Sequence, residues 1–147
     1  MNSKIYKNEV AVFTPDEINT SLESTNRQYL QGDLKKEQLL SYIYSNNSEI
    51  GISDYKEYCH DDPHYHDFIT ETNYVITGRL CLHIIDTGKD YVIEAGGVFS
   101  VPPKVKHVLK IQPGTRIIFF KNHSMNDKHV VSFEEKDFET WYADKNF

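Results

Sequence analysis

The sequence predicts an all-β domain, an antiparallel barrel or sandwich, with helical segments at both ends of the chain. Two observations support this prediction. From about residue 50 to residue 121, β-branched and aromatic segments alternate with turn pairs such as Thr77-Gly78 and Pro113-Gly114. No helical segment intervenes among these short strands, and that arrangement is typical of antiparallel sheets that pack face to face or close into a barrel.

The length of 147 residues predicts one domain over residues 1–147, with a barrel core at about 50–121. An N-terminal extension at 1–49 and a C-terminal helix at about 133–143 complete it. Hydrophobic residues make up 39% and charged residues 26%, as in ordinary soluble globular proteins. The net charge of -6 argues against nucleic-acid binding. No apolar run approaches the roughly 20 residues that cross a bilayer.

The N-terminal residues and the cysteines indicate a cytoplasmic protein. The first 13 residues, MNSKIYKNEVAVF, lack the apolar stretch and the cleavage site of a secretory signal. Cys59 and Cys81 have no CxxC spacing and offer one possible bridge, so reduced thiols are expected. Cys59 is expected to be a small buried thiol, because no basic residue at a fixed spacing would activate it.

The N-terminal extension carries signals for two helices. Thr14, Pro15 and Glu17 form a capping pattern that predicts a short helix after Thr14. The segment DLKKEQLLSYIYS is predicted to form a further helix from Asp33, although its β-branched and aromatic end opposes this interpretation.

The C-terminal helix is predicted from a second capping pattern, Ser132-x-x-Glu135. A loosely helical apolar stripe follows, formed by Phe133, Phe138, Trp141 and Tyr142. This stripe is expected to dock onto the domain or onto a second subunit. The many aromatic residues and the two helical ends together predict a homodimer.

Within the β region, Thr77-Gly78 predicts a two-residue hairpin that pairs Val75 with Leu80. Strand alternation then places one mostly apolar set on the same face: Glu71, Asn73, Val75, Leu80, Leu82 and Ile84. A glutamate at one end of an apolar face suits a barrel interior with a polar mouth. Arg79, Cys81 and His83 fall on the opposite face, so His83 is expected not to be a ligand.

The segment HYHDFITE, residues 64–71, contains the first part of a predicted metal site. On a strand, His64 and His66 project from the same face, so both imidazoles can converge on one ion. Glu71 lies at odd spacing from them, so a turn over DFIT is required. After Gly96, Gly97 and a double proline, His107 is a fourth candidate ligand from another strand.

The full pattern is His64-x-His66-x4-Glu71-x6-Gly78, followed by Gly96-x5-Pro102-x4-His107. It resembles the two signature motifs of the cupin superfamily, over about residues 58–111. The resemblance implies a cupin-type antiparallel β-barrel (jelly roll), in which His64, His66, Glu71 and His107 are the metal ligands. The sequence departs from the family pattern at four positions, none of them a ligand: Tyr58, Gly97, Lys104 and Ile111.

The implied cofactor is one divalent transition metal ion, which could be Mn, Fe, Ni, Co or Zn, because ligand type alone does not select among them. The leading hypothesis is a metal-dependent enzyme that acts on a carbohydrate or related small polar metabolite. The metal would act as a Lewis acid in an isomerase, epimerase or lyase reaction. A non-haem iron dioxygenase and a non-catalytic ligand-binding cupin are the alternatives, since the fold does not determine the function.

Polar residues near the predicted site provide candidates for the chemistry. Tyr58, Lys56 and Lys121 are candidate catalytic groups. Asn73, Arg116 and Tyr55 are candidate substrate-binding groups. Three further histidines are not expected to bind the metal: His60, which precedes a predicted turn, and His123 and His129, which follow the last strand.

Overall fold

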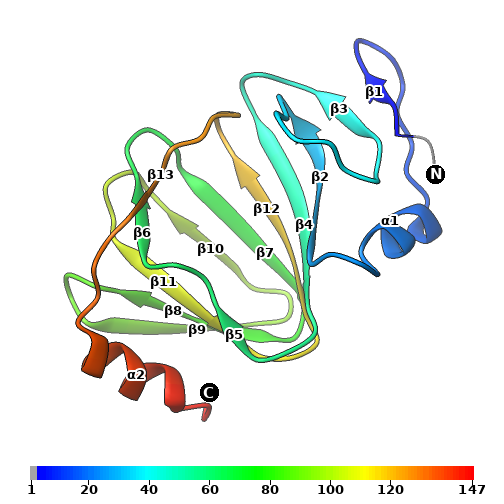
Figure 1. The fold of residues 1–147 in the computed structure, drawn as a ribbon. Helices are drawn as coiled ribbons and strands as arrows, with labels where there is room; N and C mark the ends of the chain where they lie inside the picture. Colours follow the sequence, from blue (N-terminus) through cyan, green and yellow to red (C-terminus); the bar gives the residue numbers. More distant parts are fainter. Residues whose placement is uncertain (1–2) are drawn as a thin grey trace.

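The computed structural model describes residues 3–147 as two β-sheets that face each other (Figure 1). The first sheet has seven strands, and all its pairs are antiparallel except those that β3 makes with β1 and β2. Its order is β1 (Ile5–Tyr6), β3 (Tyr42–Tyr44), β2 (Arg27–Gly32), β4 (Glu49–Tyr55), β12 (Thr115–Lys121), β7 (Glu71–Thr77) and β10 (Val98–Val101).

The second sheet has six strands and is antiparallel throughout. Its order is β13 (Lys128–Val130), β6 (His64–His66), β11 (His107–Ile111), β8 (Arg79–Ile84) and β9 (Lys89–Glu94), while β5 (Cys59–His60) also pairs with β11. The all-β prediction is therefore confirmed. The two sheets are not joined into a closed barrel.

The hydrophobic core lies between the two sheets. Its central residues come from both sheets and include Val75, Leu80, Leu82, Leu109 and Ile117. The predicted apolar set is therefore directed to the interior. Because strand residues alternate between faces, the inner face of each sheet carries both the core and, toward one end, the polar residues of the site.

The predicted pairing within that set is wrong. β7 pairs with β10 and β12, and β8 pairs with β9 and β11. The Thr77-Gly78 link therefore carries the chain from one sheet to the other. Gly78 has a φ of +82°, and a Cβ there would lie 2.5 Å from the Cα of Thr115. The link passes too close to β12 for any other residue.

The predicted helix after Thr14 is confirmed as α1 (Pro15–Ser21), with the complete capping box between Thr14 and Glu17. The turn that follows buries Leu22, which together with Leu40 and Ile52 is almost fully buried. Ile52 alternates with the inward-facing Ser53 along β4, so the N-terminal extension covers the outer face of the first sheet near β2 and β4.

The predicted helix from Asp33 is wrong. Residues 33–41 form bends and irregular chain, and the β-branched and aromatic end of the segment forms β3 instead. The side chain of Gln38 accepts the N–H of Tyr29 and donates to the carbonyl oxygens of Tyr29 and Leu40. Two of these bonds tie the segment to β2, so contacts with a distant strand override the helical pattern.

The C-terminal helix is present as α2 (Glu135–Ala143), but its N-cap is Glu134 and not Ser132. The helix packs on the outer face of the second sheet. There the buried Lys110 donates to the carbonyl oxygens of Trp141 and Asp144, both at 2.7 Å. A cation at the last carbonyl groups stabilises a helix end. No helix within residues 3–147 has the length and apolar character needed to cross a membrane.

Candidate metal centre

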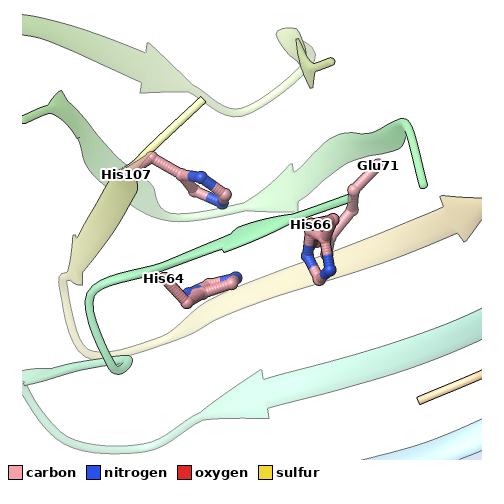
Figure 2. A group of neighbouring side chains, drawn as sticks. All are labelled: His64, His66, Glu71 and His107. Carbon is pink, nitrogen blue, oxygen red and sulfur yellow. Dashed lines mark ion pairs between the residues drawn. The ribbon is translucent and has the colours of Figure 1, made fainter. Parts of the chain in front are cut away.

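Four side chains from three strands meet between the sheets (Figure 2). His64 and His66 alternate inward along β6, and His107 pairs directly with His64 across the ladder from β11. Glu71, at the start of β7, comes from the opposite sheet. One ligand atom from each residue lies within 4.8 Å of the others. The structure thus brings together the four residues expected to bind metal.

The three histidines are held in one tautomer by backbone carbonyl groups. The Nδ1–H groups donate to the carbonyl oxygens of Asp62, Asp127 and Val105, at 2.5, 3.0 and 2.9 Å for His64, His66 and His107. A carbonyl only accepts, so Nδ1 carries the proton and each neutral ring keeps a free lone pair on Nε2. Such a bond from the second nitrogen is typical of histidines that bind metals.

The environment of these lone pairs fits a metal ion. Among the described residues, His66 Nε2 is the one buried side-chain nitrogen or oxygen without a hydrogen-bond partner. A buried polar atom without a partner costs free energy that a bound cation would recover. Two ligands at about 2.1 Å from one ion lie at most about 4.2 Å apart, so small side-chain movements would suffice. The cluster could therefore hold a transition metal with three imidazoles and one carboxylate.

Glu71 is ionised in this environment. Burial opposes its charge, but nearby positive charges, among them that of Lys121, outweigh burial and hold its pKa at about 2. Lys121 lies opposite both Glu71 and Glu49, and its Nζ is 3.4 Å from the Glu49 carboxylate. A carboxylate that is charged at neutral pH is ready to bind a cation.

Asp127 shapes the segment between the ligands, and the sequence analysis did not select it for that role. Its carboxylate accepts the N–H groups of Phe68 and Ile69, at 2.8 and 3.1 Å. Burial opposes its charge, yet these bonds keep the pKa of its carboxyl group below the ordinary value. Asp127 thus holds the predicted turn through its side chain and orients His66 through its carbonyl oxygen.

Asp61 is a second residue that the sequence analysis missed. Its carboxylate accepts the N–H of Leu109 at 2.7 Å and approaches His64 Nδ1 to 4.0 Å. Burial raises the pKa of this carboxyl group to about 7. No spacing rule identifies Asp61, because its position depends on the register in which β5 pairs with β11.

Three of the six polar candidates lie on the inner face of the first sheet. Asn73 is two residues from Glu71 on β7 and only 2% exposed, and Lys121 pairs with Glu71. Tyr55 also faces inward and packs against the core. It pairs with Thr115, at the opposite end of β12 from Lys121.

The other three candidates lie away from the cluster, which corrects their predicted roles. Tyr58 stacks on Tyr142 under α2 and donates to its carbonyl oxygen, and burial raises the pKa of Tyr58 to about 12. Lys56 donates to the carbonyl oxygens of residues 22 and 23. Arg116 forms an ion pair with Asp54 on the outer face and bonds Asn19 of α1. We assign none of them to the chemistry of the site.

The remaining histidines and the cysteines also lie outside the cluster. His60 packs edge-on against Phe138 and Tyr142, and His83 contacts Trp141, so both lie under α2. His129 stacks on Tyr65, and His123 is exposed. Cys59 and Cys81 are free thiols, and burial raises the pKa of both, to about 11 for Cys81.

Two facing β-sheets around three histidines and a glutamate define a class of small β proteins with an interior polar site. Comparison with known families assigns the class: residues 56–120 match the family model described as Cupin domain. Residues 56–120, which are 65 of the 147 residues, are therefore a cupin domain, as the motifs predict. A comparison with curated protein sequences finds no match.

The solved structures that share this fold are named as different kinds of protein. An oxalate oxidase in complex with the substrate analogue glycolate is 22% identical, with a TM-score of 0.50 over 58% of this chain. The match covers 46% of that chain, so this protein spans less than half of its length. The polyketide cyclase RemF from Streptomyces resistomycificus is 18% identical, with a TM-score of 0.53 over 65% of this chain and 68% of that one. KdgF from Halomonas sp. is 14% identical, with a TM-score of 0.51 over 66% and 77%. At these identities the likeness establishes the fold.

The buried histidines predict that acid destabilises the metal-free protein. Burial lowers the pKa of His64 to about 4 and also lowers that of His107, whereas an unfolded histidine titrates near 6.5. Between these values the unfolded chain binds protons that the folded chain does not. The stability that depends on neutral His64 and His107 is therefore fully present above about pH 6.5 and is lost as the pH falls toward 4. For His64 the loss at pH 5 should be on the order of 2 kcal/mol.

Thermal unfolding of chelator-treated protein at pH 7.5 and 5 (about one unit above and about one and a half units below the histidine reference value) measures this effect. Asp61 opposes it, because its raised pKa favours the folded state on acidification. The informative quantity is therefore the difference between the wild type and His64→Gln. The variant should lose less stability than the wild type between the two pH values. An equal loss in both proteins would contradict the assignment to His64.

Proposed function

We propose that this protein is a metal-dependent enzyme that acts on a carbohydrate or related small polar metabolite by isomerisation, epimerisation or elimination. One observation carries the proposal: three neutral imidazoles and an ionised carboxylate converge in the interior, with their free lone pairs directed to one volume. Mn, Fe, Ni, Co and Zn all suit this set of donors.

A divalent ion bound there would polarise a carbonyl or hydroxyl oxygen of the substrate as a Lewis acid. The residues of the chain supply the other functions. Asn73 has a buried amide two residues from Glu71 on the same face of β7, where it can bind a substrate hydroxyl. Lys121 places an ammonium group beside Glu71, where it can hold or release a proton.

Oxidation by dioxygen is the second candidate, because the same four donors suit iron. One solved structure with the same fold is named an oxalate oxidase, which favours keeping this candidate. A non-catalytic binding protein is the third candidate, and it predicts binding without any change in the ligand.

The mass of the product distinguishes these candidates. Protein loaded with Mn, Ni, Zn or Fe(II) would be incubated with a metabolite extract, with and without oxygen, and followed by mass spectrometry. We expect turnover without oxygen and with several metals, giving a product of unchanged mass or one that has lost water. A product that has gained oxygen, formed only with Fe(II) and air, would establish the dioxygenase. Unchanged metabolites in every sample would favour the binding protein.

We also propose that the protein is a homodimer that buries the outer face of the first sheet. Tyr74, Val98 and Phe120 lie on that face of adjacent strands and are 45, 58 and 42% exposed. Sedimentation velocity at micromolar concentration should show a dimer, for which about 800 Å² per partner would suffice. Val98→Lys should shift it to a monomer, whereas Val10→Lys, at a site 87% exposed, should not. A monomeric wild type would refute the proposal.

A further inference from the structure

Arg27 lies on the same inner face as the metal cluster. It pairs with Ser53, which pairs with Ile117, which in turn pairs with Val75 of the core. Residues that pair directly across a ladder share a face of the sheet. Arg27 therefore points between the two sheets, from a strand that the sequence analysis did not consider for the site.

The guanidinium group of Arg27 is held in place by neutral groups. Its Nε donates to Ser53 Oγ at 2.9 Å and one terminal nitrogen donates to Tyr55 Oη at 3.4 Å. Its central carbon lies 4.8 Å from the centroid of the buried Phe119 ring. The ion pairs among residues 3–147 include none that involves Arg27. The other terminal nitrogen, and the second N–H of the one that bonds Tyr55, are thus left for a planar anion, in the fork geometry that binds a carboxylate.

Arg27 is also accessible and close to the cluster. The residue is exposed, although the ring beneath it is only 1% exposed. Lys121, which pairs with Glu71, has its ammonium group 5.4 Å from the same Phe119 centroid. The two cationic groups therefore lie at most about 10 Å apart, across one aromatic ring. A small metabolite can span the volume from Arg27 to the metal ligands.

We propose that Arg27 binds the carboxylate of the substrate, and that the substrate is a small hydroxylated carboxylic acid such as a sugar acid. In this arrangement Arg27, positioned by Ser53 and Tyr55, binds the carboxylate end. The four metal ligands and Asn73 bind the hydroxyl or carbonyl end. The metal-binding half of this arrangement rests on the proposed function, whereas the Arg27 half does not.

The charges near Arg27 favour a single carboxylate over a phosphate. Asp61 and Glu71 lie close enough to Arg27 for its positive charge to act on both carboxyl groups. Lys121 is already balanced by Glu49 and Glu71. One unpaired cation among these acids suits a singly charged ligand, because a dianion would meet their repulsion.

The test compares ligands that differ only in the carboxylate. Calorimetric titration would measure the binding of D-glucuronate against D-glucose, and of glycolate against ethylene glycol, to metal-loaded and chelator-treated protein. We expect each carboxylate to bind the wild type at least tenfold more tightly than its neutral counterpart. Arg27→Gln should abolish this preference, and Arg27→Lys, which keeps the charge without the fork, should retain part of it. Arg79→Gln, at an exposed ion pair with Glu94, is the matched control and should bind as the wild type does.

Three outcomes overturn the proposal: no preference for the carboxylates in the wild type, the same preference in Arg27→Gln, or binding of inorganic phosphate as tight as that of glucuronate. Thermal unfolding and metal content of each variant confirm that the fold and cluster are intact. An Arg27-dependent preference that persists in a protein unable to bind any metal would sustain the carboxylate site and refute the metal-dependent function. Metal binding without that preference would refute the carboxylate site and leave the metal-dependent function standing.

Discussion

Replacing His107 with alanine should remove bound metal from the protein and leave the two sheets folded. The side chain supplies one of four donors, and its Nδ1–H already has a partner in the carbonyl group of Val105. A chelate that loses one imidazole loses much of its affinity, because the remaining donors no longer surround the ion. We expect a drop from about one ion per wild-type chain to none after dialysis, measured by plasma mass spectrometry.

His83→Ala is the control for this experiment. His83 is a partly buried histidine, but it lies on the outer face of the second sheet against Trp141 and is not part of the cluster. Its removal should leave the metal content unchanged. Circular dichroism of both variants should retain the β signal of the wild type. A folded His107→Ala variant that keeps its metal would contradict the assignment of the centre.

The four residues of the cluster could be predicted from the sequence because they lie at short, characteristic spacings within two motifs. His64 and His66 are two residues apart on one strand, so alternation alone directs both rings to one side. His107 pairs with His64 in the ladder, and the chain between them is punctuated by glycines and prolines that limit the possible turns. The motifs therefore sufficed to predict which four residues come together, although the order of the strands in the sheets was not known.

The rest of the site depends on contacts between distant strands. Arg27 reaches the interior only because β2 pairs with β4 in one register, and no local pattern in residues 27–32 reveals it. Tyr58 and Lys110 face α2, whose docking on the second sheet was not specified by its apolar stripe alone. The same reasoning explains the failed hairpin, since Thr77-Gly78 has the residues of a hairpin turn but joins two sheets.

Asp127 is the clearest test of this dependence on distant contacts, because it lies 56 or more residues beyond Glu71, His66 and the turn that it supports. Asp127→Ala should leave the N–H groups of Phe68 and Ile69 without their acceptor. The buried N–H of Ile69 without an acceptor costs about 1–3 kcal/mol, and the partly buried N–H of Phe68 costs less. We therefore expect a large fall in the unfolding temperature. Because the turn joins His66 to Glu71, metal affinity should also fall by about 10- to 100-fold, as for other residues that orient ligands.

Two further variants separate the effect on the turn from a general effect of removing charge. Asp127→Asn keeps an oxygen that can accept the same N–H groups, so it should retain more stability and more metal affinity than the alanine variant. Asp86→Ala removes an acid from an exposed position in the turn between β8 and β9, and it should change neither quantity. Metal affinity would be measured by titration with Zn²⁺ at a temperature where every variant is folded. Equal affinities for the wild type and Asp127→Ala under those conditions would show that the turn does not position the ligands, since the carbonyl group of residue 127 alone would then be sufficient to orient His66.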